Sequence, residues 1–277
     1  MATTTPTTPL LIRQLERLPA NPTAAVRVLW LADDPNSSSE DLAAAVSTDP
    51  ALTTRIMHMA NSAYYGLSGK VLSSAFAITI LGFSAVRTLA AAAAAGALGQ
   101  ERAVPDGFWA HAAATAAGSA LVAARVGAPR NEAFSLGLLH DIGRALLHRV
   151  DPDLSASITA TSGTCGTSLL DAERAAFGLD HVEAAVRVLS AWRFPPEFVE
   201  AISAHHGDVE TVTSPLTRAL VTGEALADHA RGEDGRDAAD HEAVAVDVGG
   251  LDPSEIEGFV AHVRREADVL AGSFFLS

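Results

Sequence analysis

The chain has 277 residues, enough to bury a substantial core in one large domain or two closely packed ones. Its net charge of −14 disfavours nucleic acid as a partner, because an acidic surface repels the phosphate backbone. The single cysteine, Cys165, excludes an internal disulfide and a CxxC redox or zinc-ribbon site. No secretory signal is present, and the most apolar stretch, 89–98, is shorter than the roughly 20 residues that span a membrane. We therefore expect a soluble cytoplasmic protein with no membrane partner.

The first half of the chain is predicted to be helical after a disordered Thr/Pro-rich tail over residues 1–9. Asn21-Pro22 is a cap followed by an N1 proline, and predicts a helix with Val26, Leu29 and Trp30 on one face. Strand signals are nearly absent from this half. Further helices are expected around Leu42 and Val46, after Asp49-Pro50, and over Ala75–Leu81 and Ser84–Leu98.

A polar segment with Pro105 predicts a domain boundary, dividing a helical subdomain over 10–104 from a second one over 105–277. Residues 231–250 are acidic and rich in Gly, and are expected to form a loop with a short strand-like segment, AVAVDV. The fold class is therefore all-α. The second half is predicted to contain helices over Phe108–Val126, through His140 and Asp141, over Leu154–Ser162 and Ser168–Phe177, from His181 to Trp192, from Pro196, from Pro215 through Asp228, and from Ser254.

The segment Phe134–Gly143, FSLGLLHDIG, places an imidazole and a carboxylate side by side in an apolar helix that is expected to stop at Gly143. Burying His140 and Asp141 is costly unless something pairs with them. A divalent metal would satisfy both, with nitrogen and oxygen donors. The alternative is a pair of side chains hydrogen-bonded to each other or to the backbone.

The ten histidines fall into two groups. The first group has polar or helix-surface neighbours and is expected to be exposed: His58, His148, His229, His241 and His262. The second group lies beside apolar residues in predicted helices: His111, His140, His181, His205 and His206. With Asp141 and Asp228 these make a dispersed set of donors on separate helices, which is how a helical bundle builds a metal site in its core.

Other familiar site motifs are missing, since the chain has no GxSxG, GxGxxG or HExxH. Asn61, Tyr64 and Tyr65 follow a predicted helix and could form a binding surface. We favour a structural role in which they fix that loop onto the second half, because Asn and Gly are natural helix terminators.

Several blocks of the sequence resemble the HDOD (HD-related output domain) family, over residues 10–230. They include DPALTTRIMHMANSAYYG, FWAHAAATA, AFSLGLLHDIGR and GLDHVEAAVRVLSAWRFPPEFVEAISAHH. The resemblance implies a modified HD phosphohydrolase fold in which an N-terminal helical bundle packs on an HD-like helical domain. It also implies a role in bacterial signalling without established catalysis.

The wider HD superfamily, including the HD-GYP cyclic-di-GMP phosphodiesterases, uses a recurring series of metal ligands. In that series Asp141 would bridge two metals, and iron, manganese or zinc would suit the mixed donors. Three departures weaken the enzyme interpretation: Arg144 stands where HD-GYP enzymes have lysine, GDVET replaces the ERxDGxGYP signature, and Gly107 stands where some relatives have a glutamate ligand. By resemblance the series maps onto His111, His140, Asp141, His181, His205, His206 and Asp228.

Three functions remain open. The leading hypothesis is a signalling module that acts through a protein partner with little or no catalysis, with one or two metal ions, or a nucleotide, in the HD-like pocket. The second is a metal-dependent phosphohydrolase of a nucleotide or cyclic dinucleotide, with Asp141 and Arg144 as candidate catalytic residues. The third and weakest is di-iron oxidation or redox or gas sensing. A metal-free network of hydrogen-bonded histidines is the structural alternative.

Overall fold

The structure is a computed structural model that describes residues 24–98, 103–162, 167–232 and 238–272. Within these ranges it contains helices and turns and no strand, which confirms the all-α prediction. The predicted tail over 1–9, the Asn21-Pro22 cap and Cys165 lie outside the described residues.

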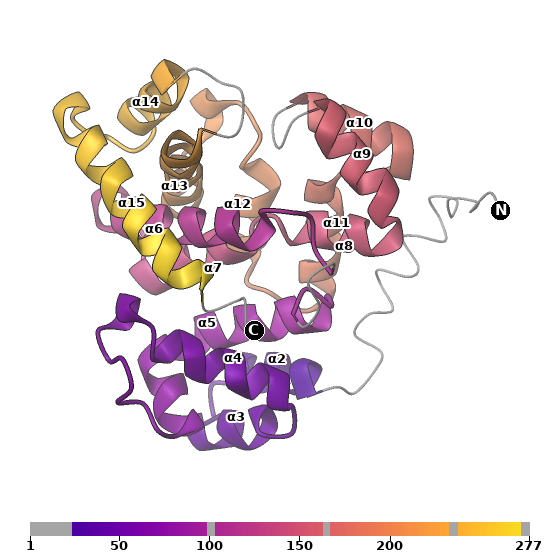
Figure 1. Cartoon of the computed structure of the whole chain (residues 1–277), viewed down its shortest axis with the longest axis vertical. Coiled ribbons are helices and arrows are strands. Elements are labelled where there is room, and N and C mark those ends of the chain that lie inside the picture. Colours follow the sequence, from indigo (N-terminus) through magenta and orange to yellow (C-terminus); the bar gives the residue numbers. More distant parts are fainter. Residues whose placement is uncertain (1–23, 99–102, 163–166, 233–237, 273–277) are drawn as a thin grey trace.

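The first group of helices lies together in the lower part of Figure 1. The predicted caps are present here. Ser38 and Asp41 form a reciprocal capping box, and the Asp49 carboxylate accepts hydrogen bonds from the first backbone N–H groups of the following helix. The elements are α2 (Ala24–Asp33), α3 (Ser39–Val46), α4 (Pro50–Ala60), the 3₁₀ turn η2 (Ala63–Tyr65) and α5 (Ser74–Ala94).

Helix α5 is broken at Gly82, whose backbone (φ 79°, ψ 159°) is open to glycine and strained for other residues. The prediction of two successive helices is therefore confirmed. By length and composition α5 could cross a membrane, which the sequence analysis did not recognise. Of its apolar window, 61% is buried inside the protein, as in the core helix of a globular domain.

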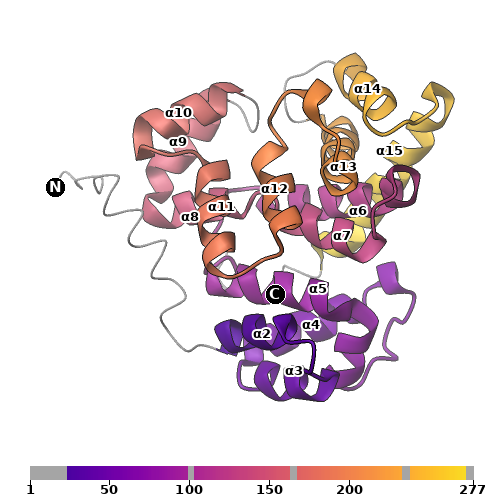
Figure 2. The ribbon, with the colours of Figure 1, turned by 180° about the vertical axis from the view of Figure 1, so that it is seen from behind.

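The second group of helices surrounds the centre of the molecule. Both views place α8–α11 on one side and α13–α15 on the other, with α6, α7 and α12 between them (Figures 1 and 2). The elements are α6 (Phe108–Val126), α7 (Arg130–Leu139), α8 (Ile142–Val150), α9 (Pro152–Ser162), α10 (Thr167–Phe177), α11 (His181–Ala191), α12 (Pro196–Ala204), η3 (Val209–Thr211), α13 (Pro215–Arg231), α14 (Ala238–Asp247), η4 (Pro253–Glu255) and α15 (Ile256–Ala271).

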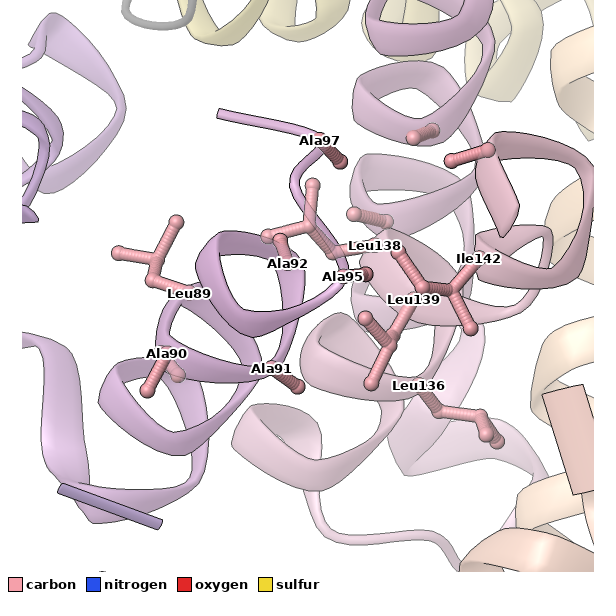
Figure 3. Close-up of a cluster of buried hydrophobic side chains, with 14 of the residues drawn as sticks. Leu89, Ala90, Ala91, Ala92, Ala95, Ala97, Leu136, Leu138, Leu139 and Ile142 are labelled. Atoms are coloured by element: carbon pink, nitrogen blue, oxygen red, sulfur yellow. The ribbon is translucent and has the colours of Figure 1, made fainter. Parts of the chain in front are cut away.

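One buried core joins the two groups. Leu89 and its neighbours on α5 lie in the same cluster as Leu136 and Leu139 of α7, and all three leucines are fully buried (Figure 3). A hydrophobic core without a break is favoured because each buried leucine contributes about 1.5 to 3 kcal/mol. The predicted boundary at residue 104/105 falls in the connection between α5 and α6, and the division into subdomains stays a prediction.

The loop after α4 is fixed to the second group. The Asn61 side chain exchanges hydrogen bonds with the backbone of Val71 (2.8 and 3.0 Å), and the Tyr64 ring lies 5.2 Å from that of Phe134 on α7. The Tyr64 hydroxyl also accepts a hydrogen bond from Arg130. These contacts support the structural role that we favoured.

Two local predictions are wrong. Trp30 is 62% exposed, because the buried stripe of α2 is centred on Val28 and Leu29 and leaves Trp30 outside it. The supposed loop over 231–250, with its strand-like AVAVDV, contains helix α14. Its alternating Ala and Val residues resemble a strand pattern, but alanine is the strongest helix former. Helix α14 packs against α13, and Arg218 of α13 donates a hydrogen bond to the carbonyl of Val248, the residue after α14.

Glycines allow α6 and α13 to cross closely. A Cβ atom at Gly118 would lie 2.6 Å from the Gly223 carbonyl oxygen, and one at Gly223 would lie 2.3 Å from the Ser119 backbone nitrogen. Neither backbone can be moved without shifting a whole helix. The crossing therefore fixes the distance between the two helices that carry His111 and Asp228.

We expect Gly118→Ala to lower the free energy of unfolding by about 1 to 3 kcal/mol, because the added methyl overlaps a buried backbone. Gly258→Ala is the matched control, since Gly258 is exposed on α15 with nothing within 4 Å of an added Cβ. That control should be neutral or stabilise by about 0.5 to 1 kcal/mol. Urea denaturation measures both. Equal stabilities of the two variants would contradict the close crossing.

Candidate metal centre

The candidate donors come from the ends of separate helices. His111 lies in the first turn of α6, His181 is the first residue of α11, and His205 and His206 follow the end of α12. His140 and Asp141 lie at the junction of α7 and α8. Six of the predicted donors therefore meet in the interior. Four of them are buried, and His111 and His206 are partly buried.

The helix through His140 and Asp141 is interrupted, unlike the prediction. Helix α7 ends at Leu139 and α8 begins at Ile142, because Asp141 adopts a non-helical backbone (φ −94°, ψ 14°). The break turns two consecutive side chains toward one point, whereas in a continuous helix they would diverge by about 100°. Gly143 does not stop the helix, since it lies inside α8.

Gly143 has a different role, which is to let α8 approach α11. A Cβ atom at this position would lie 1.8 Å from the His181 carbonyl oxygen, so only glycine fits. The contact brings His181 Nε2 to 3.4 Å from Asp141 Oδ1. Glycine at residue 143 thus sets the separation between two of the candidate ligands.

Two imidazole pairs flank the Asp141 carboxylate. On one side, Nε2 of His111 lies 3.2 Å from Nε2 of His140. On the other, Nε2 of His181 lies 3.2 Å from Nε2 of His206. Oδ2 of Asp141 is 3.8 Å from His111 Nε2, while Oδ1 is 3.7 Å from His140 Nε2 and 3.9 Å from His205 Nε2. Asp141 therefore belongs to two adjacent groups of donors.

The opposite ring nitrogens face acceptors. Nδ1 of His140 donates to the Gly137 carbonyl (2.7 Å), Nδ1 of His205 to the Ile202 carbonyl (2.6 Å), and Nδ1 of His181 to the Glu173 carboxylate (2.7 Å). A carbonyl or carboxylate at Nδ1 assigns the proton to that nitrogen and leaves a lone pair on Nε2. Acceptors of this kind orient the histidine ligands of metal sites.

The spacing of these atoms fits a metal better than a hydrogen-bonded network. Asp141 Oδ1 and His205 Nε2 are both buried and have no hydrogen-bond partner among the described residues. Orphaned buried polar atoms are rare in proteins and costly. Atoms that share one ion at about 2.0 to 2.2 Å are themselves about 3 to 3.5 Å apart, close to the separations here. The separations and the unpartnered atoms of the donor set thus fit a divalent metal.

Sequence reasoning missed three charged residues near the cluster. Glu173 accepts from both the backbone N–H and Nδ1 of His181, and Glu224 of α13 lies 4.0 Å from His140 Nε2. The Arg231 guanidinium is close enough to lower the pKa of His111. Glu224 lies one helical turn before Asp228, a spacing that could have suggested a shared face.

Arg144 and Asp228 occupy the edge of the cluster. Arg144 donates to Asp141 Oδ2 at 3.2 Å and is 7% exposed. The carboxylate of Asp228 lies 3.4 Å from Nδ1 of His111, which is the nitrogen that faces away from His140. In this arrangement Asp228 orients His111, and its role as a direct ligand stays a prediction.

Two histidines that we expected to be exposed are buried. His148 is 8% and His241 is 3% exposed. His148 lies on α8, which is covered on nearly every side, and His241 lies on α14, in the segment wrongly predicted to be a loop. The pattern of polar neighbours in sequence did not reveal these environments.

Burial and charge shift the pKa values within the cluster. Burial and the neighbouring His140 lower the pKa of His111 to about 3, and burial lowers that of His206 well below its usual value. Burial would raise the pKa of Asp141, but His140, His205 and Arg144 outweigh it and hold that pKa well below normal. Burial lowers the pKa of His205, but Asp141 and Glu224 raise it more strongly, so the net shift is upward. The charged Asp141 carboxylate and the neutral imidazoles of His111 and His206 are the forms that bind metal, whereas a metal would have to displace the proton that the raised pKa of His205 favours.

We expect metal-free protein to lose stability as the pH falls from 6.5 to 5. Between an unfolded pKa near 6.5 and the folded value of about 3, the unfolded chain binds a proton at His111 that the folded chain does not. One such group changes the free energy of unfolding by at most about 1.4 kcal/mol per pH unit. Below about pH 6 the raised pKa of His205 does not add to the pH dependence of the free energy of unfolding, because its imidazole is protonated in the folded and the unfolded chain alike.

Urea denaturation at several pH values measures this slope. The slope should become shallower in His111→Asn, and should remain in the control His58→Asn, because His58 is exposed on α4. An unchanged slope in His111→Asn would contradict the assignment.

Comparison with known proteins identifies the family. The HDOD domain model matches residues 18–207, a range that includes His111 through His206. A Shewanella amazonensis protein, provisionally named a phosphohydrolase, has a similar fold, with 24% identity, a TM-score of 0.72 and coverage of 96% of this chain and 98% of that chain. The MmoQ response regulator of Methylococcus capsulatus is 30% identical, with a TM-score of 0.50 and coverage of 86% of this chain and 95% of that chain.

A curated relative, an uncharacterized protein of Treponema pallidum, is 23% identical over 206 residues. The match covers 70% of this chain and 38% of the relative, so this chain corresponds to well under half of that protein. The family model spans more than half of this chain and agrees with the resemblance seen in the sequence. This protein belongs to the HDOD family.

Proposed function

We propose that the chain is a regulatory module that holds one or two divalent metal ions in a buried centre and passes its state to a signalling protein partner. Turnover of a substrate is not its main activity. The similarity to a protein named a response regulator supports the signalling role in general terms.

The observation that carries the proposal is a set of metal donors with little access to solvent. The side chains of His140, His181 and His205 are 0% exposed, and that of Asp141 is 6% exposed. Donors that are buried this deeply and come from separate helices favour a role in holding those helices together.

The donors form three overlapping groups, of which the third is His140, His205 and Glu224, and the two that share Asp141 could each hold an ion. His111, His140 and Asp141 would hold one, while Asp141 with His181, His205 and His206 would hold the other. A bound ion would supply positive charge to Asp141 and to the Nε2 lone pairs around it. Nitrogen and oxygen donors together suit iron, manganese or zinc. Because the ligands lie on α6, α7, α11 and α12, binding would be coupled to the order of all four helices.

A metal-dependent phosphohydrolase is the second candidate, and one observation favours it. His206 is only partly buried and borders a cavity of about 400 Å³, together with Arg174 and Ser203. Through this cavity a phosphate group could approach the cluster, and Arg144 lies beside Asp141 to balance developing charge. A nucleotide or a cyclic dinucleotide would be the substrate class.

Elemental analysis of the purified protein tests the metal centre. We expect one to two equivalents of iron, manganese or zinc, and loss of the metal from His140→Ala/Asp141→Ala. The matched control is His262→Ala/Glu266→Ala, which removes a His and an acidic residue from the outer part of α15. A folded protein that takes up none of these metals, even when they are added, would refute the proposal.

Glu173→Gln provides a finer test because it keeps the shape of the side chain. The neutral amide is a weaker acceptor for His181 Nδ1, so metal affinity should fall about 10- to 100-fold. Competition with a chromophoric chelator measures the affinity. Glu183→Gln on the exposed side of α11 is the control and should leave the affinity unchanged. Equal affinities in the two variants would remove Glu173 from the centre.

Assays of the metal-loaded protein with nucleotides and cyclic dinucleotides separate the two candidate functions. Our proposal predicts no turnover above that of Asp141→Ala. Multiple turnovers that disappear in Asp141→Ala, but persist in the control His262→Ala/Glu266→Ala, would instead establish the hydrolase.

A further inference from the structure

A second cavity lies where the two groups of helices meet. It has a volume of about 470 Å³ and is bordered by Ala32 at the end of α2 and by residues just after the Gly82 break in α5. Its opposite walls come from the beginnings of α7, α12 and α13. Ligand pockets commonly form at such junctions and have volumes of about 300 to 1,000 Å³.

The wall of this junction cavity is aromatic. Phe194 and Phe198 are buried at its base, and Phe83 is partly exposed. Buried aromatic side chains with one face toward a cavity offer a large contact area to a flat apolar molecule. They also attract cations through their ring faces.

Negatively charged side chains outnumber positively charged ones in the lining of the cavity. Arg87 lines it, but its guanidinium is already paired with Asp33 (3.0 Å) and lies 4.4 Å from the centre of the Phe194 ring. Glu132 and Glu197 lie on the exposed side, and neither forms a hydrogen bond or an ion pair with another described residue. The cavity therefore has two carboxylates that form no ion pair with another described residue, beside aromatic side chains and the paired Arg87.

We propose that this junction cavity binds a small organic cation, an aromatic or heteroaromatic body that carries an ammonium or amidinium group. The flat body would lie against Phe83 and Phe198, because the Arg87 guanidinium already lies over the Phe194 ring, while the charged group would face Glu132 and Glu197. This binding site is separate from the metal centre.

The cavity is also connected to the metal centre by three helices. Helix α7 leads from Glu132 to His140, the residue after its end, and α12 leads from Glu197 to His205, the residue after its end. Helix α13 carries both Leu216 and Glu224. At 1.5 Å per residue each connection spans about 12 Å. A ligand that moves the beginnings of these helices would displace the donors at their ends.

The loop before α12 begins at the left-handed terminus of α11. Arg193 has a positive φ of 58°, and the N–H groups of Arg193 and Phe194 donate to the carbonyls of Ser190 and Leu189, as is usual where a helix ends in this conformation. Arg87 adds hydrogen bonds to the carbonyl groups of Trp192 and Arg193. Because the same guanidinium lines the cavity, a ligand that displaces it would remove these hydrogen bonds from the loop before α12. We infer that the occupied cavity alters metal affinity, and this part rests on the proposed function.

Titration of the full chain with benzamidine, benzamide and benzoate, followed by NMR, tests the binding site. Benzamidine should bind saturably with a Kd of about 1 to 10 mM, as expected for a fragment of its size. Benzamide should bind more weakly, and benzoate should not bind. Saturable binding of benzoate equal to that of benzamidine, or no binding of benzamidine up to about 30 mM, would overturn the proposal.

Two variants locate the binding. Glu132→Gln/Glu197→Gln should weaken benzamidine binding about tenfold, since two carboxylate contacts are lost. Glu200→Gln/Glu210→Gln, with the same change in charge at exposed positions outside the cavity, should bind as the wild type does. Ser84→Phe, which fills the cavity without changing charge, should abolish binding while the circular dichroism spectrum stays native. Unchanged binding in the first or the last variant would overturn the assignment.

The coupling is tested by repeating the benzamidine titration with metal-loaded protein. Linkage requires the metal to change benzamidine affinity by the same factor as benzamidine changes metal affinity, and we expect about fivefold or more. Equal affinities with and without metal would overturn the coupling. A protein that takes up no metal would refute the proposed function. The titrations with metal-free protein would still show whether the junction cavity binds benzamidine.

Discussion

The buried charge of Asp141 is the constraint on which the centre of this molecule depends. A carboxylate that is 4% exposed is tolerated only when positive or hydrogen-donating groups surround it. Here Arg144 provides a single hydrogen bond to Oδ2, and Oδ1 faces imidazole nitrogens at 3.4 to 3.9 Å. A metal would complete this environment, which is why the donor set points to a cation.

Backbone features, more than side-chain packing, bring the donors together. The break between α7 and α8 turns His140 and Asp141 toward one point, and Gly143 lets α11 approach α8 within a distance that no other residue permits. The Gly118–Gly223 crossing fixes α6 and α13 in the same way. The junction cavity depends on another glycine, since the break at Gly82 opens α5 beside it.

Much of this structure could be predicted from the sequence, for physical reasons. Caps such as Ser38 and Asp49 act locally, so helix beginnings were readable, and the HDOD blocks identified the family and the second-half histidines. Tertiary features were not readable. Trp30 is exposed because neighbouring helices cover only one side of α2, and Glu173 reaches His181 from another helix, eight residues earlier in the chain.

His140 and His205 share a feature with a consequence for dynamics. Each is the residue that follows a helix, and each donates from Nδ1 to the carbonyl three residues before it. These imidazoles thus cap carbonyl groups that a helix end leaves without a partner. Each of these donors is therefore held in its orientation only while the last turn of its helix is formed. Fraying of α7 or α12 would withdraw a donor, so occupancy of the centre becomes visible as slower amide exchange at two helix ends.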